Sequence, residues 1–538
     1  MKARYPRAGG RVTACRGVPG LYTGPMYAAV LARKYLTTKA IPLLAALAVT
    51  LSVATELIVW SVMGGFLTML VNEGRKTDGD LRITWENVGF GHYQDLVDRL
   101  EAHPAIAHAT PMIETLAILG MPDDRPVTVQ LLGVDPASYA AATVYEQSLY
   151  WRPIESPVPG DAEGNDPRLR TEDHGVLERW LREGRSLRTP TGEAAMVTGI
   201  AATGWNRRVM PGNFYVPYYS EQKLASGGVN LDIEFLPNLS VRLTVMPLGQ
   251  ESAGALDLRT IEFPIANELS TGNYAYDSRI ALVPLEALQD LLQMGEARRV
   301  DPSSNPFAIE VGPDGVERPK GPTIVGEAPA RVTDVLVRAA PGVKGDQLQQ
   351  AAEAVYAQFE AEHRGEVPSP RAIAIMTYEQ RNAMFIGAVQ KETTLVLFIF
   401  GVVSLTSVFL VLAIFWAMVS EKTRDIGVLR AIGASGTGVA AVWVGYGLAI
   451  GVVGSALGAG LAALVVTNIN PIHEWMGKAL GVQVWDPNVY YFTTIPTDLD
   501  STKFVIIVAG GIIASVVGAL VPAARAAWMD PVKALRFD

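Results

Sequence analysis

The chain of 538 residues is 49% hydrophobic and 18% charged, with a formal net charge of −9. A soluble domain carries about 25% charged residues, so this composition favours a membrane protein. The sequence contains no basic patch of the nucleic-acid-binding type, which excludes DNA or RNA as an expected partner. The single cysteine, Cys15, excludes an internal disulfide, so an exported domain would depend on its hydrophobic core alone.

The first 39 residues form a basic entry to the membrane. Residues 1–25 are rich in Gly, Pro and Arg, which is typical of disorder. Residues 26–39 already make a complete amphipathic segment, so we expect translation to start at Met26. Cys15 follows a faint lipoprotein-cleavage pattern, but no apolar segment precedes it, and we interpret it as incidental.

Charged residues are nearly absent from four windows of the sequence. Apolar runs of about 18 or more residues indicate membrane helices, which need about 20 residues to cross a bilayer. The first three windows exceed this length, so their ends are expected to project or tilt. The windows are Ala40–Val71, Thr393–Val419, Val439–Thr467 and Phe504–Val521.

The distribution of Lys and Arg near these windows predicts the orientation. Residues 1–39 carry eight of them, and further ones follow the second and fourth windows, whereas residues 468–502 contain only Lys478. We therefore expect both termini and the segment Glu421–Ser435 in the cytoplasm. Residues 73–389 and 468–502 are expected outside.

The large insertion alternates strand and helix patterns, which predicts an α+β domain with a β-rich insertion. Arg75 and Lys76 lie on its exported side against the charge rule, although long domains translocate largely regardless of charge. Proline-rich stretches predict surface loops at 152–172 and 301–330. The expected strands are Asp80–Trp85, Ala109–Leu119, Val127–Val134, Leu239–Val245, Arg279–Val283 and Arg331–Val337, and the expected helices are Tyr93–Glu101, Leu285–Leu292 and Gly345–His363.

Motifs for covalent chemistry are missing from the sequence. It has no phosphate-binding GxxxxGK[ST] loop, no HExxH and no GxSxG, so we expect no ATP hydrolysis by this chain alone and no catalytic residues. Among the six histidines, His103 and His108 are the nearest pair, and no third ligand falls in register. We therefore expect no metal site and no bound cofactor.

The predicted membrane helices carry two unusual features. Small residues four apart let helix backbones approach closely, either within one chain or across a dimer interface. Glu56 lies near the middle of the first window, where a carboxylate either relays protons or is hydrogen-bonded to other helices. A relay would need a second carboxylate or histidine in another span, and the sequence offers none. The small residues are Gly447, Gly451, Gly454 and Gly458 in the third window and Gly510, Ala514 and Gly518 in the fourth.

The segment Glu421–Ser435, EKTRDIGVLRAIGAS, lies between two predicted spans and predicts a short helix. Its apolar residues Ile426, Leu429 and Ile432 are expected on one side. Gly427 and Gly433 each cost a helix up to about 1 kcal/mol relative to Ala, which is understandable if another backbone approaches closely. The alternative is an ordinary cytoplasmic turn. The polar residues are Glu421, Lys422, Arg424, Asp425 and Arg430.

This segment resembles the signature loop of MacB/FtsX-type ABC transporter permeases. The order of one span, a large exported domain and three further spans is also similar to that family. Within it, several segments resemble the lipoprotein-releasing LolC and LolE proteins, whereas residues 137–270 and 295–330 depart from them. The similar segments are SVMGGF (Ser61–Phe66), GNYAYDSRIALVPLEAL (Gly272–Leu288), TYEQRNAMFIGAVQKE (Thr377–Glu392), WDPNVYYFTTIP (Trp485–Pro496) and PAARAAWMDPVKALR (Pro522–Arg536).

The resemblance implies a permease subunit in a bacterial inner membrane, with both termini cytoplasmic. Its coupling helix would dock on a separate ATPase dimer that binds ATP and Mg²⁺, and it would work beside a second permease, identical or paralogous. The exported domain would be periplasmic and would pass lipoproteins to a periplasmic carrier. MacB-like efflux and FtsX-like signalling to a cell-wall hydrolase are the alternatives. From position alone, cargo contact is expected at Val62, Met63, Phe66, Met384 and Phe385.

The predicted domains follow from these spans. They are a disordered extension (1–25), a cytoplasmic amphipathic segment (26–39), transmembrane helix 1 with its stalk (40–72), a periplasmic domain (73–389), transmembrane helix 2 (390–420), a coupling loop (421–438), transmembrane helix 3 (439–467), a periplasmic loop (468–502), transmembrane helix 4 (503–524) and a cytoplasmic tail (525–538).

Overall fold

A computed structural model describes most of the chain from residue 40 onward, so the predictions for residues 1–39 lie outside the described residues. The described residues are 40–86, 88–158, 161, 163–169, 174–209, 214–217, 219–223, 229–246, 258–300, 309–311, 317–319, 324–480, 485 and 494–535.

The chain divides into two compact units, which are described separately. The helical unit contains Met1–Gly65, Lys391–Asn468 and Thr497–Asp538. The mixed unit contains Phe66–Gln390 and Ile469–Pro496.

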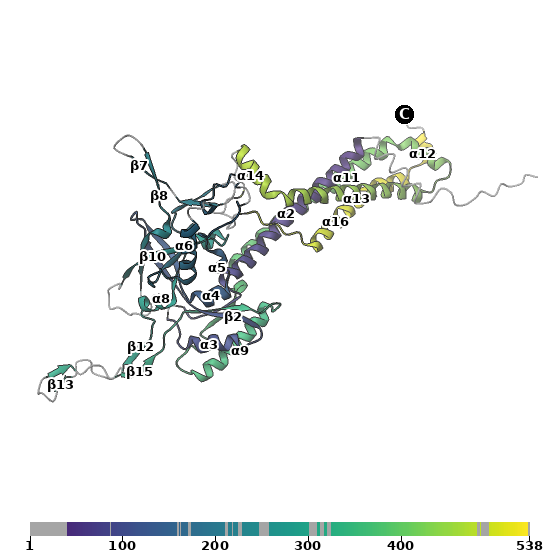
Figure 1. Cartoon of the computed structure of the whole chain (residues 1–538). Coiled ribbons are helices and arrows are strands. Elements are labelled where there is room, and N and C mark those ends of the chain that lie inside the picture. The colour runs from purple at the N-terminus through teal and green to yellow at the C-terminus, as the bar shows by residue number, and fades with distance from the viewer. Residues whose placement is uncertain are drawn as a thin grey trace, which may run out of the picture. The chain divides into compact units, whose positions relative to one another are not determined.

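Four long apolar helices account for the predicted membrane spans (Figure 1). Within the described residues, these four are long and apolar enough to cross a membrane, with mean hydropathies of 2.0 to 2.8 over their most apolar windows. The prediction of four apolar helices with a large α/β insertion between the first and the second is confirmed. The helices are α2 (Ala40–Asp78), α11 (Ala383–Glu421), α13 (Gly436–Thr467) and α16 (Ser501–Ala527).

The helical unit packs around a small aromatic and aliphatic core. Val53 of α2, Phe415 of α11 and Ile450 of α13 are almost completely buried in it. The Phe415 and Tyr446 rings meet edge to face at 5.8 Å between centroids. The outer surfaces of these helices stay apolar, as expected for side chains that face lipid.

The mixed unit is built on a nine-stranded sheet in the order β17-β1-β16-β2-β3-β11-β4-β10-β9. β2 also pairs with β9, with Ala117 opposite Val245, so six of the strands form a closed ring. The pairs β3–β11 and β4–β10 are parallel and the remaining pairs are antiparallel. Closure removes unpaired strand edges, which otherwise invite association with other chains.

The strands predicted from the sequence all belong to this sheet. Their bounds are β1 (Leu81–Thr84), β2 (Ile106–Gly120), β3 (Pro126–Val134), β4 (Met196–Gly199), β9 (Ser240–Val245), β10 (Arg259–Leu269), β11 (Ile280–Pro284), β16 (Asp334–Ala339) and β17 (Ala374–Thr377). Four separate pairs are β5 (Asn206–Val209) with β6 (Phe214–Pro217), β7 (Tyr219–Lys223) with β8 (Val229–Ile233), β12 (Ala297–Val300) with β15 (Ile324–Ala328), and β13 (Ile309–Val311) with β14 (Glu317–Pro319).

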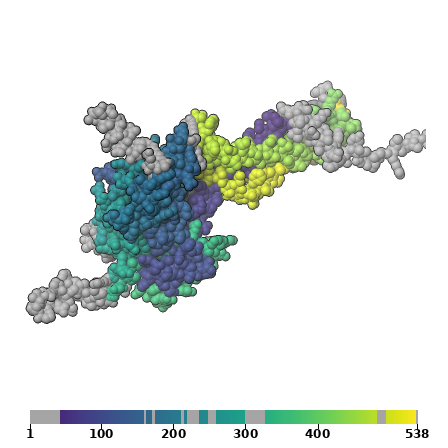
Figure 2. Space-filling view, in the orientation of Figure 1, coloured from purple at the N-terminus to yellow at the C-terminus, as the bar shows by residue number. Residues whose placement is uncertain are grey.

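Helices cover this sheet, and Figure 2 shows the mixed unit as one continuous packed body. α3 and α9 lie side by side (Figure 1), with Leu96, Leu100 and Phe359 fully buried between them and the sheet. The helices of this unit are α3 (Tyr93–Glu101), α4 (Pro136–Ala142), α5 (Tyr145–Ser148), η1 (Pro167–Leu169), α6 (His174–Ser186), η3 (Leu236–Asn238), α7 (Tyr274–Asp277), α8 (Leu285–Leu292), α9 (Gly345–Glu362), α10 (Tyr378–Arg381) and α14 (Ile469–Leu480).

The prediction of a loop at 301–330 is wrong, and that of a surface loop at 152–172 holds in part, because the described residues there form no element except η1 (Pro167–Leu169). The 301–330 region contains β13, β14 and β15, because short antiparallel pairs form between its prolines. In the 152–172 region, Asp166 and Arg168 are buried and bind each other, with Arg168 Nη2 2.6 Å from Asp166 Oδ2. Pairing lets charged residues leave the surface, which composition alone does not reveal.

The last turns of α2 belong to the mixed unit and are bound to it by charged side chains. Arg75 Nε lies 2.6 Å from Asp80 Oδ1. Asp78 accepts hydrogen bonds from both Arg82 and Arg381. Gly74 leaves room for the Tyr378 ring, which a Cβ at this position would overlap. The chain entering from the first span and the chain leaving for the second are therefore joined by charge pairs and close packing.

Candidate functional site

The segment between the second and third apolar helices folds as predicted into a short helix, α12 (Thr423–Ala431). Gly433 follows with φ +104°, a left-handed conformation that favours glycine and ends the helix. Ser435 then caps α13, because its Oγ accepts a hydrogen bond from the Gly438 N–H at 3.1 Å. A rigid turn therefore joins α12 to α13.

The three apolar residues expected on one side of α12 have different environments. Ile426 is buried against Val419, Val439 and Ala526. Leu429 is 41% exposed and Ile432 is 77% exposed. Of the three, only Ile426 packs against other helices, and Ile432 lies just beyond the last residue of α12.

Gly427 is buried beneath a short C-terminal helix, α17 (Pro531–Leu535). A Cβ added at Gly427 would lie 2.8 Å from the Ala534 Cβ, closer than real Cβ contacts. The backbone that approaches this glycine is therefore the chain's own tail. The sequence analysis missed this partner, although Asp530-Pro531 is a helix-start signal and the Asp530 side chain accepts the Val532 N–H at 2.9 Å.

The charged residues of the segment differ in their exposure and in their contacts. Lys422 Nζ lies 2.9 Å from Asp425 Oδ2, one turn away. Arg430 Nη1 donates to the Ala434 carbonyl at 3.2 Å, so this side chain stabilises the turn after α12. Glu421 and Arg424 are exposed.

Apolar side chains remain exposed on both packed helices. We name the exposed residues of this pair the α12/α17 surface. Large apolar side chains left in water on a charged helix mark an interaction site. The surface consists of Val428, Leu429, Ile432, Val532 and Leu535, which are 41% to 77% exposed.

Five of the six predicted packing glycines contact other helices of the same unit. A Cβ at Gly447 would meet Ala519 of α16 at 2.6 Å, and one at Gly454 would meet Val49 of α2 at 2.8 Å. Ser515 Oγ also donates to the Gly447 carbonyl at 2.8 Å. Gly451 approaches α16, Gly458 approaches α2 and Gly518 approaches α11, whereas Gly510 is exposed with no atom within 4 Å of an added Cβ.

Glu56 is hydrogen-bonded to a second helix of this unit. Ser404 Oγ of α11 donates to Glu56 Oε2 at 3.0 Å, and Ser404 Oγ lies 3.2 Å from Ser52 Oγ. The carboxyl thus joins α2 to α11, which favours the hydrogen-bonded alternative over a proton relay.

The predicted cargo residues fall in both units. Val62 and Met63, in the helical unit, are half-buried. In the mixed unit, Phe66 is buried with its ring edge to face against Trp485 at 6.1 Å, whereas Met384 is 92% exposed and Phe385 is 37% exposed. Of these five, Met384 is the most accessible.

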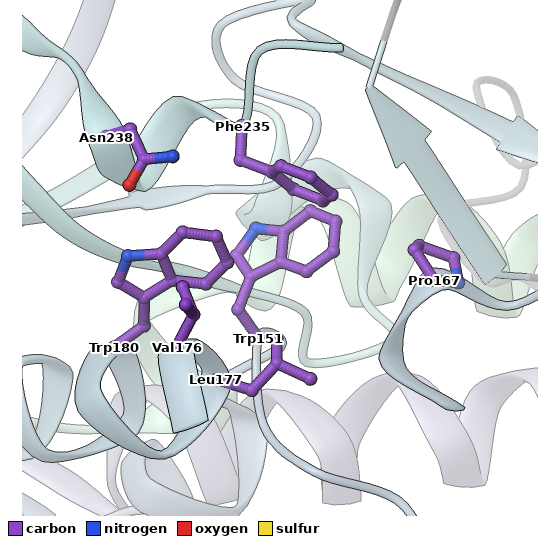
Figure 3. Close-up of a pocket in the computed structure, with 7 residues that line it drawn as sticks. All are labelled: Trp151, Pro167, Val176, Leu177, Trp180, Phe235 and Asn238. Atoms are coloured by element: carbon purple, nitrogen blue, oxygen red, sulfur yellow. The ribbon is translucent and has the colours of Figure 1, made fainter. Parts of the chain in front are cut away.

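The mixed unit also contains a small aromatic pocket that the sequence analysis missed. It has a volume of about 140 Å³. Figure 3 shows the rings of Trp151, Trp180 and Phe235 gathered around it, with Val176 and Leu177 of α6 below. It lies within residues 137–270, where the resemblance to the lipoprotein-releasing proteins is weakest.

Trp151 is held in this pocket by a buried carboxyl group. Its Nε1 donates to Glu268 Oε2 at 2.7 Å, and Asn206 Nδ2 donates to Glu268 Oε1 at 2.7 Å. Its backbone N–H donates to Asn267 Oδ1 at 3.0 Å. Burial raises the pKa of Glu268 to about 8, although the hydrogen bonds from Trp151 and Asn206 favour the charged form.

Three potential metal ligands, His92, His363 and Glu366, have ligand atoms within 4.8 Å of one another. The two imidazole rings are stacked at 4.1 Å and 18°. One ion cannot lie in the planes of two stacked rings, and His363 Nε2 already lies 2.9 Å from Asp95 Oδ2. The arrangement matches a pair of histidines held by carboxylates. His103 and His108, the nearest pair of histidines in the sequence, are not part of this cluster.

Comparison with known proteins places the α12 site in a known domain. Residues 397–531 match the family described as FtsX-like permease C-terminal. The chain therefore contains an FtsX-like permease domain. The match begins in α11 and reaches the first residue of α17, so it includes α12.

More distant relatives are LolC and LolE proteins, described as lipoprotein-releasing system transmembrane proteins. LolC from Xylella fastidiosa is 26% identical over 164 residues, which is 30% of this chain and 40% of the relative. LolC from Neisseria meningitidis is 26% identical over 167 residues, 31% of this chain and 40% of the relative. LolE from Haemophilus influenzae is 25% identical over 22% of this chain and 28% of its own length. These matches thus span less than half of each relative.

One solved structure, the periplasmic region of MacB from Actinobacillus actinomycetemcomitans, matches with 10% identity and a TM-score of 0.25. The match covers 59% of this chain and 97% of that one.

Proposed function

We propose that this protein is the permease subunit of an ABC transporter in a bacterial inner membrane, with both termini in the cytoplasm. It works with a separate ATPase dimer, which binds ATP and Mg²⁺, and with a second permease, identical or paralogous. The chain itself supplies no catalytic residue. Its cargo is a lipoprotein, lifted from the outer leaflet into a periplasmic carrier.

The observation that carries the proposal is the α12/α17 surface, whose α12 part lies inside the FtsX-like domain. α12 is short, joined to α13 by a rigid capped turn and packed on α17 through Gly427. Its exposed apolar residues Leu429 and Ile432 lie beside charged ones, which suits docking on a soluble partner. A force applied here passes directly to two of the apolar helices.

The glycine contacts provide a route for that force within the helical unit. α13 touches α16 at Gly447 and α2 at Gly454, and α16 touches α11 at Gly518. Such close backbone packing resists independent movement of single helices. α2 and α11 each have residues in both units. Asp78, the last residue of α2, binds Arg381, the last residue of α10, which directly precedes α11. Movement of these two helices would therefore be transmitted to their residues in the mixed unit.

Lipoprotein as cargo rests on the similarity to LolC and LolE and on exposed Met384. A 92% exposed methionine at the start of a long apolar helix is a suitable contact for an acyl chain. Val62, Met63, Phe66 and Phe385 are proposed as further contacts.

Photocrosslinking tests the cargo. The full chain and its ATPase are co-expressed with a photoreactive phenylalanine at Met384, and a matched control carries it at Phe409, which is 61% exposed on the same helix. We expect acylated protein captured from position 384 and not from 409. Intact ATP hydrolysis without capture of acylated protein contradicts lipoprotein extraction. Capture of a cell-wall hydrolase instead supports FtsX-like signalling.

A further inference from the structure

Helix α14 (Ile469–Leu480) begins two residues after the third apolar helix ends. Apolar residues of α13 continue to Val466, and Thr467 and Asn468 follow. α13 has 32 residues, which at about 1.5 Å per residue exceeds the roughly 30 Å hydrocarbon core of a bilayer. A helix that starts directly after such a span starts near a membrane surface.

One face of α14 is fixed to the returning chain. Asn470 Oδ1 accepts the Ile495 N–H at 2.8 Å, and Asn470 Nδ2 donates to the Ile495 carbonyl at 3.3 Å. One turn later, His473 Nε2 accepts the Trp485 N–H at 3.1 Å. These bonds set the rotation of the helix about its axis.

The opposite face is apolar and exposed. At about 100° per residue, Ile472, Trp475 and Ala479 lie on the side of the helix opposite Asn470 and His473. Trp475 is 63% exposed, Ile472 is 36% exposed, and Leu480 at the helix end is 64% exposed. Glu474 lies on the fixed side. Asn470 and His473 thus bind protein, while Trp475 and Leu480 remain largely exposed in the part of the chain that the structure describes.

We propose that α14 is an interfacial helix whose Ile472, Trp475 and Ala479 face lies in the bilayer surface where α13 ends. Lipid is the occupant because α14 begins two residues after an apolar helix of membrane-spanning length ends and carries an exposed tryptophan. Tryptophan in the centre of an apolar face suits the headgroup level, where its ring is buried and its N–H meets water. The helix would hold the end of α13, and the loop bound to Asn470, at a fixed depth.

The single cysteine makes a direct test practicable. In a Cys15→Ser background, Ile472→Cys and Ala479→Cys report the apolar face, and Glu474→Cys is the matched control on the fixed face. Each full-length variant is labelled with bimane in phospholipid nanodiscs. Quenching is compared between doxyl-labelled phosphatidylcholine and aqueous iodide.

We expect doxyl lipid to quench the labels at 472 and 479 about twofold or more above the label at 474, with the reverse order for iodide. Two outcomes overturn the proposal. In one, the labels at 472 and 479 are quenched by iodide and not by lipid, which places this face in water. In the other, both labels resist both quenchers, which indicates a protein neighbour. Two independent positions keep the result interpretable if one label disturbs the helix.

Discussion

The α12 site and the Trp151 pocket use their apolar side chains differently. On α12 and α17, Leu429 and Ile432 are left in water above a tight contact between Gly427 and Ala534. In the pocket, Trp151 is fully buried and its polar atoms are all bound by neighbouring side chains. We propose that the first arrangement receives a partner, whereas the second stabilises the interior of the mixed unit. Separate substitutions test the two sites.

The largest expected effect is on the pocket. Trp151→Ala removes a fully buried ring and the hydrogen-bond donor to Glu268 Oε2, so the mixed unit should lose roughly 3–5 kcal/mol of stability. Thermal unfolding of the full chain in detergent measures this. Trp528→Ala, at an 85% exposed position, is the control and should leave the unfolding temperature unchanged. Equal effects of the two variants would show that Trp151 has no special structural role.

Gly427→Leu tests the close contact between α12 and α17. It should reduce binding of the ATPase much more than it reduces the stability of the chain. The added side chain collides with Ala534 and displaces α17, at a cost of roughly 1–3 kcal/mol. Co-purification of the ATPase should fall strongly, while membrane insertion stays normal. Gly401→Leu is the control, since no atom lies within 4 Å of a Cβ there. Normal ATPase recovery with Gly427→Leu would contradict a role for this contact in coupling.

The sequence predicted the four apolar helices, six of the nine strands of the sheet and α12, because each depends on local pattern. Each of these patterns can be recognised within a few residues. Examples are the continuous apolar runs, the alternation in Val127–Val134 and the glycine after Ile432. The partner of Gly427 was not predictable, because α17 has five residues and lies far along the chain. The same holds for the pocket, where Trp151, Trp180 and Phe235 come from separate elements. Burial of Asp166 was missed because composition shows charge but not pairing.

Stability should fall as pH rises, through two buried carboxyl groups. Burial raises the pKa of Glu268 to about 8 and that of Asp277 to about 7. In the folded state these two carboxyl groups therefore keep their protons to a higher pH than in the unfolded chain, where their pKa values are lower. The stabilisation is therefore complete below about pH 4 and is lost as pH rises to about 8, at no more than about 1.4 kcal/mol per pH unit for each group.

Glu268→Gln isolates one of these groups. It should flatten the pH dependence between about 5 and 8 and leave only the part due to Asp277. Unfolding temperatures measured over this range test the expectation. An unchanged slope in the variant would mean that Glu268 is already charged at neutral pH.

The smallest expected effect concerns Glu56. Glu56→Gln keeps an acceptor for Ser404 Oγ. The free energy of unfolding should therefore change by no more than about 0.5 kcal/mol, and the rate of transport-linked ATP hydrolysis should stay near that of the wild type. Glu56→Leu loses the acceptor and should be more harmful. Loss of activity in the Gln variant alone would revive the proton-relay alternative.

An ATPase crosslink from the α12/α17 surface tests the coupling role of α12 most directly. A photoreactive phenylalanine at Ile432, which is 77% exposed, is compared with one at Phe398, which is 69% exposed on α11. The full chain is co-expressed with its ATPase and irradiated with and without ATP. We predict a crosslink to the ATPase from position 432 whose yield changes with nucleotide, and none from 398. No ATPase crosslink from 432 in a complex that co-purifies intact would contradict the coupling role of α12.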